Sequence, residues 1–210
     1  MKQETAERAQ SSDFQDLVRR TEGVQLWRRA FHAAGGVLLA IVVDALGPKS
    51  PETTTLILAG LATGGLLDFV RLNSRTANRR FFTWFSRLAS PREAANIASS
   101  TWYVVGVLAV HLLLPAAYLV PAILVLALPD PAASIVGRLW GRHPLGKGTM
   151  EGSAVFLIVA TLVLAPFVGL GHALWVALVV TAFEVLPLPV DDNVVIPVVA
   201  GVTLWVAGLL

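Results

Sequence analysis

Apolar segments of membrane-spanning length constrain this chain more than any other feature of its sequence. Hydrophobic residues make up 55% of its 210 residues and charged residues only 14%, and the mean hydropathy is +0.69. A soluble globular domain carries about 25% charged residues. The composition therefore excludes an ordinary soluble domain and predicts an integral membrane protein, and we expect one all-α, polytopic transmembrane helix bundle rather than several domains.

About seven apolar segments can be distinguished, and a full crossing needs about 20 residues. The segment at 101–114 is short and joins the next one tightly at Leu114–Pro115, which leaves five or six crossings as an alternative. Residues 1–29 are polar, lack the apolar core of a secretory signal peptide, and precede a transmembrane domain predicted over residues 30–210. The segments run over residues 30–47, 54–72, 101–114, 116–137, 154–170, 172–188 and 193–210.

The basic residues are distributed unevenly among the loops. Six precede the first apolar segment, six lie between the second and third, and three lie between the fourth and fifth. With the N-terminus in the cytoplasm, every Lys and Arg except Lys49 falls on the cytoplasmic side, which is the asymmetry that the positive-inside rule describes. This pattern favours seven crossings, because the loss of one would scatter the charges. It predicts a multi-pass protein, of the cytoplasmic membrane if the source is bacterial.

Two stretches are predicted to form amphipathic helices at the membrane interface. Residues 12–29 begin with a Ser12–Gln15 capping-box pattern. In residues 71–88, Arg71, Arg75 and Arg79 share one helix face, and aromatic residues follow them. Basic residues beside aromatic ones suit a helix lying on anionic lipid. The alternatives are a solvated positive anchor without substrate contact and an arginine surface that meets a lipid or nucleotide phosphate.

The stretch from Pro129 to Ser153 interrupts the apolar second half with charge and glycine. Asp130–Pro131 resembles a helix start, with Asp130 as N-cap and Pro131 as first helical residue, so we expect a break near Leu128–Pro129. Asp130, Ser134 and Gly137 would then lie on one face. Charge beside membrane-length apolar sequence is costly and usually functional, although a cap and small packing residues explain the same pattern.

Three further clusters carry candidate chemistry. The glycine-rich stretch 141–153 contains Lys147 and Glu151 and suits phosphate contact, although it lacks the Walker A pattern and equally fits a flexible loop. Asp191–Asp192–Asn193, after Glu184, offers oxygen ligands for Mg²⁺, or a helix cap. Arg28–Arg29, with His32 one turn later, suits either a phosphate clamp or a plain topology signal.

Other residues narrow the choice. Asp68 and Arg71 are spaced to pair with each other at the end of the second segment. His111 and His172 fall on the opposite side of the membrane, which argues against a histidine-rich metal site. The absence of cysteine excludes disulfides and thiolate sites. The remaining charged clusters all fall at the cytoplasmic surface, where basic phosphate contacts and carboxylates for Mg²⁺ suit phosphoryl transfer.

These motifs resemble those of the membrane CTP-dependent lipid kinases, a family that includes dolichol kinase, phytol kinase and the CTP-type diacylglycerol kinase. The family is distantly related to phosphatidate cytidylyltransferase. The resemblance covers about residues 24–205. Its motifs are Arg28-Arg29-Ala30-Phe31-His32, Asp68-Phe69-Val70-Arg71, Asp130 to Arg138, Thr149-Met150-Glu151-Gly152-Ser153, and Glu184 followed by Asp192-Asn193-Val194-Val195-Ile196-Pro197.

The chain departs from the family pattern at three positions. Pro129 stands where the family usually has Gly, Arg29 replaces a Lys, and Gly148 stands where a Lys directly precedes the Ser/Thr. Lys147 lies one position before Gly148. These departures bear on the phosphate contacts and leave the acidic residues in place.

The resemblance implies an enzyme that transfers the terminal phosphate of CTP to a diacylglycerol, polyprenol or phytol hydroxyl, with Mg²⁺ as cofactor. In this hypothesis Asp130 and Asp192 hold Mg²⁺, and Glu151 is a further ligand or the base that accepts the hydroxyl proton.

The predicted partners are CTP, the lipid alcohol and membrane lipids, without nucleic acid, and the prediction leaves open whether the protein forms a homo-oligomer. The rival interpretations are a CTP:lipid-phosphate cytidylyltransferase and a small membrane transporter. The expected phosphate-binding residues are Arg28, Arg29, Gly137, Arg138, Lys147, Gly152 and Asn193, and the further candidates are His32, Asp68, Arg71, Ser134, Glu184 and Asp191.

Overall fold

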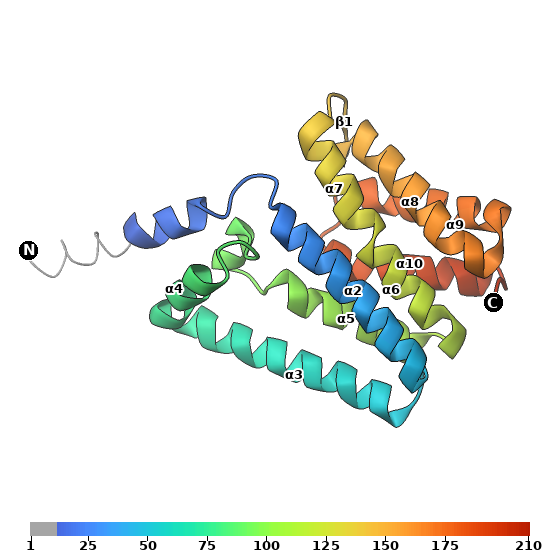
Figure 1. Cartoon of the computed structure of the whole chain (residues 1–210), viewed down its shortest axis with the longest axis horizontal. Helices are drawn as coiled ribbons and strands as arrows, with labels where there is room; N and C mark the ends of the chain where they lie inside the picture. The colour runs from blue at the N-terminus through green and yellow to red at the C-terminus, as the bar shows by residue number, and fades with distance from the viewer. Residues whose placement is uncertain (1–11) are drawn as a thin grey trace, which may run out of the picture.

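The computed structural model describes residues 12–210, and within that range the chain is helical apart from one small hairpin (Figure 1). A first helix covers residues 12–19, and the part of the predicted N-terminal segment at residues 1–11 lies outside the described range. The other elements are α2 (Leu26–Leu46), α3 (Pro51–Asn73), α4 (Arg75–Trp84), the 3-10 turn η1 (Pro91–Ala94), α5 (Ser99–Leu113), the 3-10 turn η2 (Ala116–Tyr118), α6 (Leu119–Ala127), α7 (Pro129–Trp140), β1 (Pro144–Leu145), β2 (Gly148–Thr149), α8 (Met150–Val168), α9 (Leu170–Val185) and α10 (Asp192–Val206).

The all-α prediction is confirmed, and each predicted apolar segment coincides with a helical stretch. Four stretches in residues 12–210 are long and apolar enough to cross a membrane. Shorter apolar helices form α5, α9 and α10. Crossing by all seven segments stays a prediction. The four long stretches are Leu26–Leu46, Pro51–Asn73, Ala116–Trp140 and Met150–Val168.

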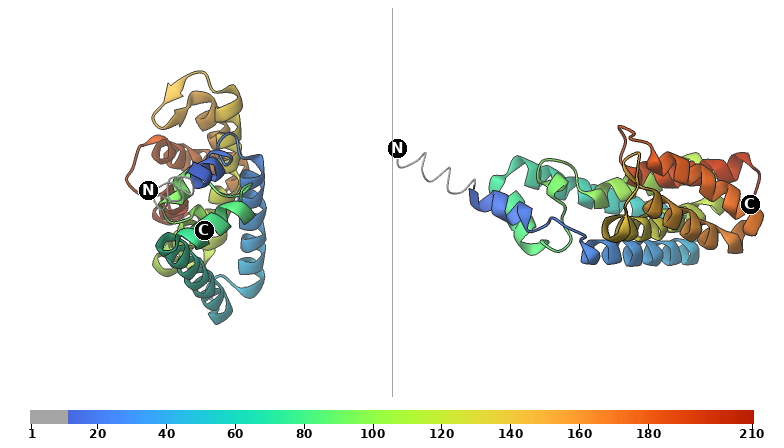
Figure 2. Two further views of the ribbon diagram at one scale, coloured as in Figure 1. Left: turned by 90° about the vertical axis from the view of Figure 1, so that its left-hand side faces the viewer. Right: turned by 90° about the horizontal axis from the view of Figure 1, so that it is seen from above.

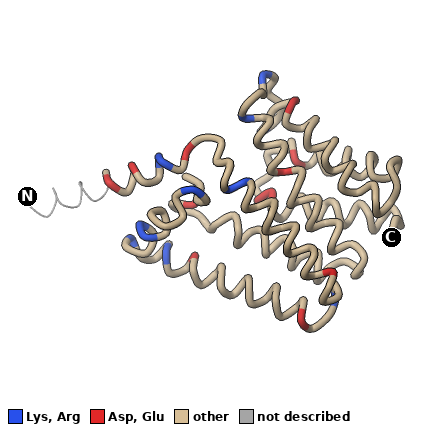
Figure 3. Tube along the Cα trace, in the orientation of Figure 1, with Lys and Arg blue, Asp and Glu red and all other residues tan. Residues whose placement is uncertain are grey.

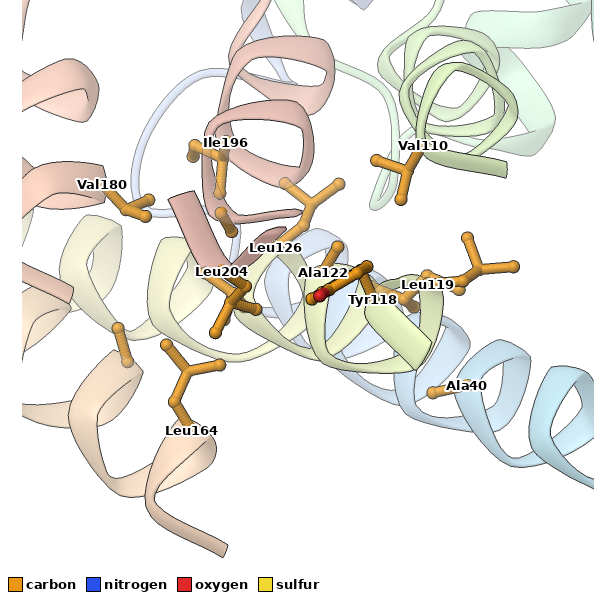
Figure 4. Close-up of a cluster of buried hydrophobic side chains, with 14 of the residues drawn as sticks. Ala40, Val110, Tyr118, Leu119, Ala122, Leu126, Leu164, Val180, Ile196 and Leu204 are labelled. Carbon is orange, nitrogen blue, oxygen red and sulfur yellow. The ribbon is translucent and has the colours of Figure 1, made fainter. Parts of the chain in front are cut away.

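Helix α6 lies at the centre of the core because it is apolar on every side. Its residues Leu119, Ile123 and Leu126 are fully buried. Helix α2 packs on α6 and α7, α8 packs on α7 and α9, and α10 packs on α5, α6 and α9. Figure 4 shows Leu126 together with Ile196 of α10 and Leu164 of α8 in this apolar cluster. The core thus joins segments that are far apart in the sequence.

The alternating direction of the helices brings most of the charge to one end of the bundle. Helices α2, α5, α8 and α10 begin at this end, and α3, α7 and α9 finish there. We call it the charged end. Figure 3 shows that most Lys and Arg positions along the backbone trace lie there, whereas Lys49 lies in the α2–α3 loop at the other end. The side view in Figure 2 shows the helix at 12–19 and α4 extending beyond the bundle at the charged end.

Both predicted amphipathic helices are shorter than expected. The helix at 12–19 ends before Gly23 and Gln25, whose φ angles are +102° and +52°, and such angles interrupt a right-handed helix. In the second stretch, Arg71 belongs to the last turn of α3, and Ser74 caps a new helix by accepting a hydrogen bond from the amide of Ala77 at 3.3 Å. The predicted arginine stripe of residues 71–79 is therefore divided between two helices.

Candidate functional site

Asp130 lies at a break in the central helix. Helix α6 ends at Ala127 and α7 begins at Pro129 with Leu128 between them, so the predicted position of the break is correct. The prediction that Asp130 caps the helix is wrong. The new helix begins at Pro129 rather than Pro131, so Asp130 lies inside its first turn and its side chain makes no cap bond. Proline favours the first helical position because its missing N–H costs nothing there.

The break also leaves backbone acceptors without helical donors. Pro129 and Pro131 have no N–H groups. The carbonyls of Val125 and Ala127, four residues earlier, therefore receive no helical hydrogen bond from them. Asp130 lies between these two prolines in the sequence, and within a membrane an irregular backbone is tolerated where it is buried in protein or lines a water-filled cavity.

The Asp130 carboxylate is half-buried and has no hydrogen-bond or ion-pair partner within residues 12–210. Its charge acts on side chains of four other helices: Arg29 and His32 on α2, Tyr103 on α5, Glu184 on α9 and Asp192 on α10. A half-buried charge without a partner costs free energy. Asp130 is thus the centre of a polar cluster that can receive a cation or a hydrogen-bond donor.

Lys147 joins the acidic residues on the α9–α10 side of this cluster. Residues 141–149 form a β-hairpin rather than an extended loop, with β1 pairing to β2 and Gly146 at φ +55° in the turn. The Lys147 amide donates to the carbonyl of Val185 at 3.2 Å, which fastens the hairpin to the end of α9. Its ammonium group donates to Asp192 and acts on Glu184. Lys147 therefore offsets part of the negative charge near Asp130.

Arg28 and Arg29 are placed in different environments. Arg28 donates to Ser99 Oγ at 2.5 Å and forms an ion pair with Glu93 at 3.3 Å, so it ties α2 to the start of α5. Arg29 uses its Nε to bind the carbonyl of Val24 at 2.8 Å and lies within the electrostatic reach of Asp130 and Arg138. Arg138 binds the carbonyl of Gly23 at 2.8 Å. Arg29 and Arg138 together form the basic side of the Asp130 cluster.

Asp68 and Arg71 form a buried network. Arg71 Nε donates to Asp68 Oδ1 at 2.7 Å. Asp68 Oδ2 accepts from the amide of Ala98 at 3.1 Å and from Thr101 Oγ1 at 2.7 Å, which fixes the start of α5. The Arg71 guanidinium also binds the carbonyl of Asn96 at 2.5 Å and stacks over Phe81. The predicted mutual pairing is correct, and neither side chain is free for a substrate.

The acidic pair before α10 divides into a cap and a candidate ligand. Asp191 Oδ1 accepts from the amide of Asn193 at 3.0 Å and from its Nδ2 at 2.7 Å. Asp191 is therefore the N-cap of α10, and the buried Asn193 side chain holds that cap. Asp192 faces Lys147 and the Asp130 cluster instead.

Other predicted residues serve local structure. Glu151 accepts a 2.7 Å hydrogen bond from His143 of the hairpin at the protein surface, and it lies outside the group on which the Asp130 charge acts. At Gly137 and Gly152, helices α7 and α8 approach so closely that a Cβ at Gly152 would lie 3.4 Å from the Gly137 Cα. Ser134 is half-buried on α7. Close helix packing thus accounts for both glycines.

Three side chains that lie beside the predicted residues were not identified from the sequence. Tyr103 reaches the Asp130 cluster from α5, His143 holds Glu151, and Glu93 binds Arg28. Tyr103 lies in an apolar run whose pattern gives no sign of its neighbours. The Ser90–Glu93 spacing is a capping box that predicts local structure, and the structure contains it.

The side chains fit Mg²⁺ only as part of a nucleotide complex. Within residues 12–210, no group of three or more His, Asp or Glu side chains is placed to hold a metal ion. Mg²⁺ in nucleotide-dependent enzymes typically uses one or two carboxylates together with substrate phosphates. Asp130 and Asp192, which interact electrostatically, would be the two carboxylates of such a site.

Comparison with models of protein families finds no match for this chain. Comparisons with curated proteins and with solved structures find no similar chain. Arguments about function therefore depend on the residues and their geometry.

Proposed function

We propose that this protein is a CTP-dependent lipid kinase, which transfers the terminal phosphate of CTP to the hydroxyl of a lipid alcohol. The observation that carries the proposal is the unpartnered, half-buried Asp130 carboxylate with Arg29, Glu184 and Asp192 around it. Phosphoryl transfer depends on positioning and on electrostatic stabilisation of phosphate oxygens. The cluster offers carboxylates and basic groups for both tasks, next to apolar helices.

In this proposal all seven helical segments cross the membrane and the charged end faces the cytoplasm. The distribution of Lys and Arg supports this orientation. The segment around α4 would lie at the interface, where Trp27 and Trp84 are 65% and 75% exposed. A surface hollow of about 310 Å³ beside Trp27 and Arg87 belongs to this interfacial region and is separate from the Asp130 cluster.

The nucleotide phosphates would lie between the basic and acidic sides of the cluster. Arg29 and Arg138 would neutralise phosphate charge from α2 and α7, and Lys147 would do so from the hairpin. Mg²⁺, held by Asp130 and Asp192 together with the phosphates, would neutralise the charge that develops during transfer. Arg28 would act as a structural clamp rather than a phosphate ligand, because its guanidinium binds Glu93 and Ser99.

The reaction forms one bond and breaks one. The lipid hydroxyl oxygen attacks the terminal phosphorus of CTP, and the bond between that phosphorus and the bridging oxygen breaks. CDP leaves with the bonding electron pair. The hydroxyl proton passes to the Glu184 carboxylate of the cluster and then to solvent. We assign no proton transfer to Glu151, because its carboxylate is occupied by His143 at the surface.

The test is a substrate panel with the purified chain in nanodiscs. CTP and ATP are each combined with Mg²⁺ and with a diacylglycerol, a polyprenol or phytol. We expect phosphorylated lipid and CDP in equal amounts, and loss of both in Asp130→Asn. The matched control is Asp44→Asn, an exposed carboxylate near the other end of α2.

Three outcomes would overturn the proposal in distinct ways. Release of pyrophosphate from CTP and a lipid phosphate would identify a cytidylyltransferase. Solute uptake into liposomes without nucleotide would identify a transporter. Wild-type activity in Asp130→Asn would remove the Asp130 cluster from the reaction.

A further inference from the structure

The Tyr103 hydroxyl is a buried polar group without a partner. Tyr103 lies in the second turn of α5 and is 9% exposed. Its hydroxyl is the one fully buried side-chain oxygen or nitrogen atom in residues 12–210 that has no hydrogen-bond partner. Burying a hydroxyl without a hydrogen bond costs free energy, and phenylalanine would fill the same space without that cost. The hydroxyl therefore calls for an explanation other than packing.

The hydroxyl lies beside the end of α6, next to the break in the central helix. It lies against Gly36 of α2 and Ala127 at the end of α6, where a Cβ added to Gly36 would collide with it. The ring of Tyr103 meets the His32 ring edge-on at 5.0 Å. The Ala127 carbonyl is one of the two that lose a helical donor to proline. Asp130 acts electrostatically on both Tyr103 and His32.

Tyr118 provides a comparison within the same chain. It is also buried in the core, but its hydroxyl donates to the carbonyl of Leu210 at 3.2 Å. The two tyrosines thus differ in hydrogen bonding rather than in burial. A buried hydroxyl is satisfied where the structure needs it only for stability, and Tyr103 departs from that behaviour beside the candidate site.

We propose that the Tyr103 hydroxyl binds the hydroxyl group of the lipid alcohol and positions it beside Asp130. This inference rests on the proposed function and adds the lipid side of the site. The Asp130 charge acts on His32 of α2 and Tyr103 of α5, and also on Glu184 of α9 and Asp192 of α10. The lipid hydroxyl then lies between Tyr103 and Asp130.

In this proposal the lipid tail lies against the apolar sides of α2 and α3. Helices α2 and α3 separate from their shared loop toward the charged end, as the views in Figures 1 and 2 show. Their outer faces carry exposed apolar side chains, including Leu38 and Leu66. Gly36 covers the Tyr103 hydroxyl, so binding displaces α2 at the Gly35–Gly36 pair, and small-residue pairs are where helices bend most readily.

Tyr103→Phe tests the inference by removing one oxygen atom, with Tyr118→Phe as the matched control. We expect Tyr103→Phe to raise the KM for the lipid alcohol about three- to tenfold, the range expected for one hydrogen bond. The KM for CTP should stay unchanged. Without lipid, its unfolding temperature should equal or exceed that of the wild type. Tyr118→Phe should lower the unfolding temperature and leave the KM for the lipid unchanged.

A binding measurement separates failure of this inference from failure of the proposed function. The unfolding temperature is measured in detergent without CTP, with and without a short-chain diacylglycerol, a polyprenol or phytol. Stabilisation of the wild type by one of these alcohols, reduced in Tyr103→Phe, supports the inference even if no phosphorylated lipid forms. Equal stabilisation of both proteins together with equal KM for the lipid overturns it, as does an absence of stabilisation by all three alcohols.

Discussion

Asp68 and Asp130 are two acidic residues of the bundle with opposite environments. Asp68 is 5% exposed and accepts hydrogen bonds from Arg71, Thr101 and the amide of Ala98. Asp130 is half-buried and has no such partner within residues 12–210. Asp68 lies near the end of α3 and Asp130 in the first turn of α7, and both belong to motifs of the same resemblance. The Asp68 carboxylate is fully engaged in hydrogen bonds that hold the fold together. The Asp130 carboxylate has no such bond in the described part of the chain.

The comparison shows how position in the fold separates two similar residues. The turn just before α5 supplies one backbone donor, the Ala98 amide, to Asp68. Around Asp130, the nearby turn contains two prolines that supply none. Where a neighbouring turn offers free N–H groups, an acidic side chain accepts hydrogen bonds from them and stabilises the fold. Where the turn offers none, the carboxylate stays without a hydrogen-bond partner.

The largest expected effect is on stability at Asp68. Asp68→Ala should lower the free energy of unfolding by about 3–5 kcal/mol, because it leaves the Arg71 guanidinium buried without its counter-charge. Chemical unfolding in detergent, followed by circular dichroism, measures the change. A loss below 1 kcal/mol would place Asp68 outside the structural framework, contrary to this comparison.

The second effect is on activity at Asp130. Asp130→Asn should lower kcat/KM for phosphoryl transfer about 10²- to 10³-fold, as expected for the loss of one transition-state contact. Its unfolding free energy should stay equal or rise, because no partner loses a bond. Activity is measured as CDP formation, and unfolding is measured as for Asp68→Ala. Strong destabilisation by this variant would show that Asp130 is structural as well.

The adjacent residues Asp191 and Asp192 show the same contrast between a structural carboxylate and a carboxylate of the candidate site. Asp191→Ala removes the N-cap of α10 and should cost about 1 kcal/mol of stability with activity retained. Asp192→Asn should lower activity and leave the cap in place. Measuring activity and unfolding for both variants decides between the roles, and a reversed pattern would exchange them.

The smallest effect is expected at Arg92. Its ion pair with Asp191 spans 3.5 Å, and its side chain is 82% exposed. Arg92→Gln should change the unfolding free energy by less than about 1 kcal/mol, because water and salt screen exposed pairs. Unfolding at low and high ionic strength checks this value. A larger loss would mean that the Asp191 cap depends on Arg92.

The sequence predicted helices better than the partners of their side chains. Composition led to the all-α class, and proline chemistry located the break near Leu128. The exact place of Asp130 in the new helix was missed, because two neighbouring prolines can each begin a helix. Lys147 and Glu151 were expected in one phosphate loop, but the hairpin turns them toward Asp192 and His143. Tyr103 could not be predicted, since its isolation depends on Gly36 and Ala127, which are distant in sequence.

The wide sequence spacing of the Asp130 cluster sets an order of events during synthesis. Arg29 and His32 leave the ribosome early, Asp130 follows much later, and Asp192 comes near the end. At about 5–20 residues per second, the interval from Arg29 to Asp192 is roughly ten to thirty seconds. Arg29 spends that time beside an incomplete bundle. Because α10 supplies Asp192, the Asp130 cluster is complete only after α10 has packed against α6.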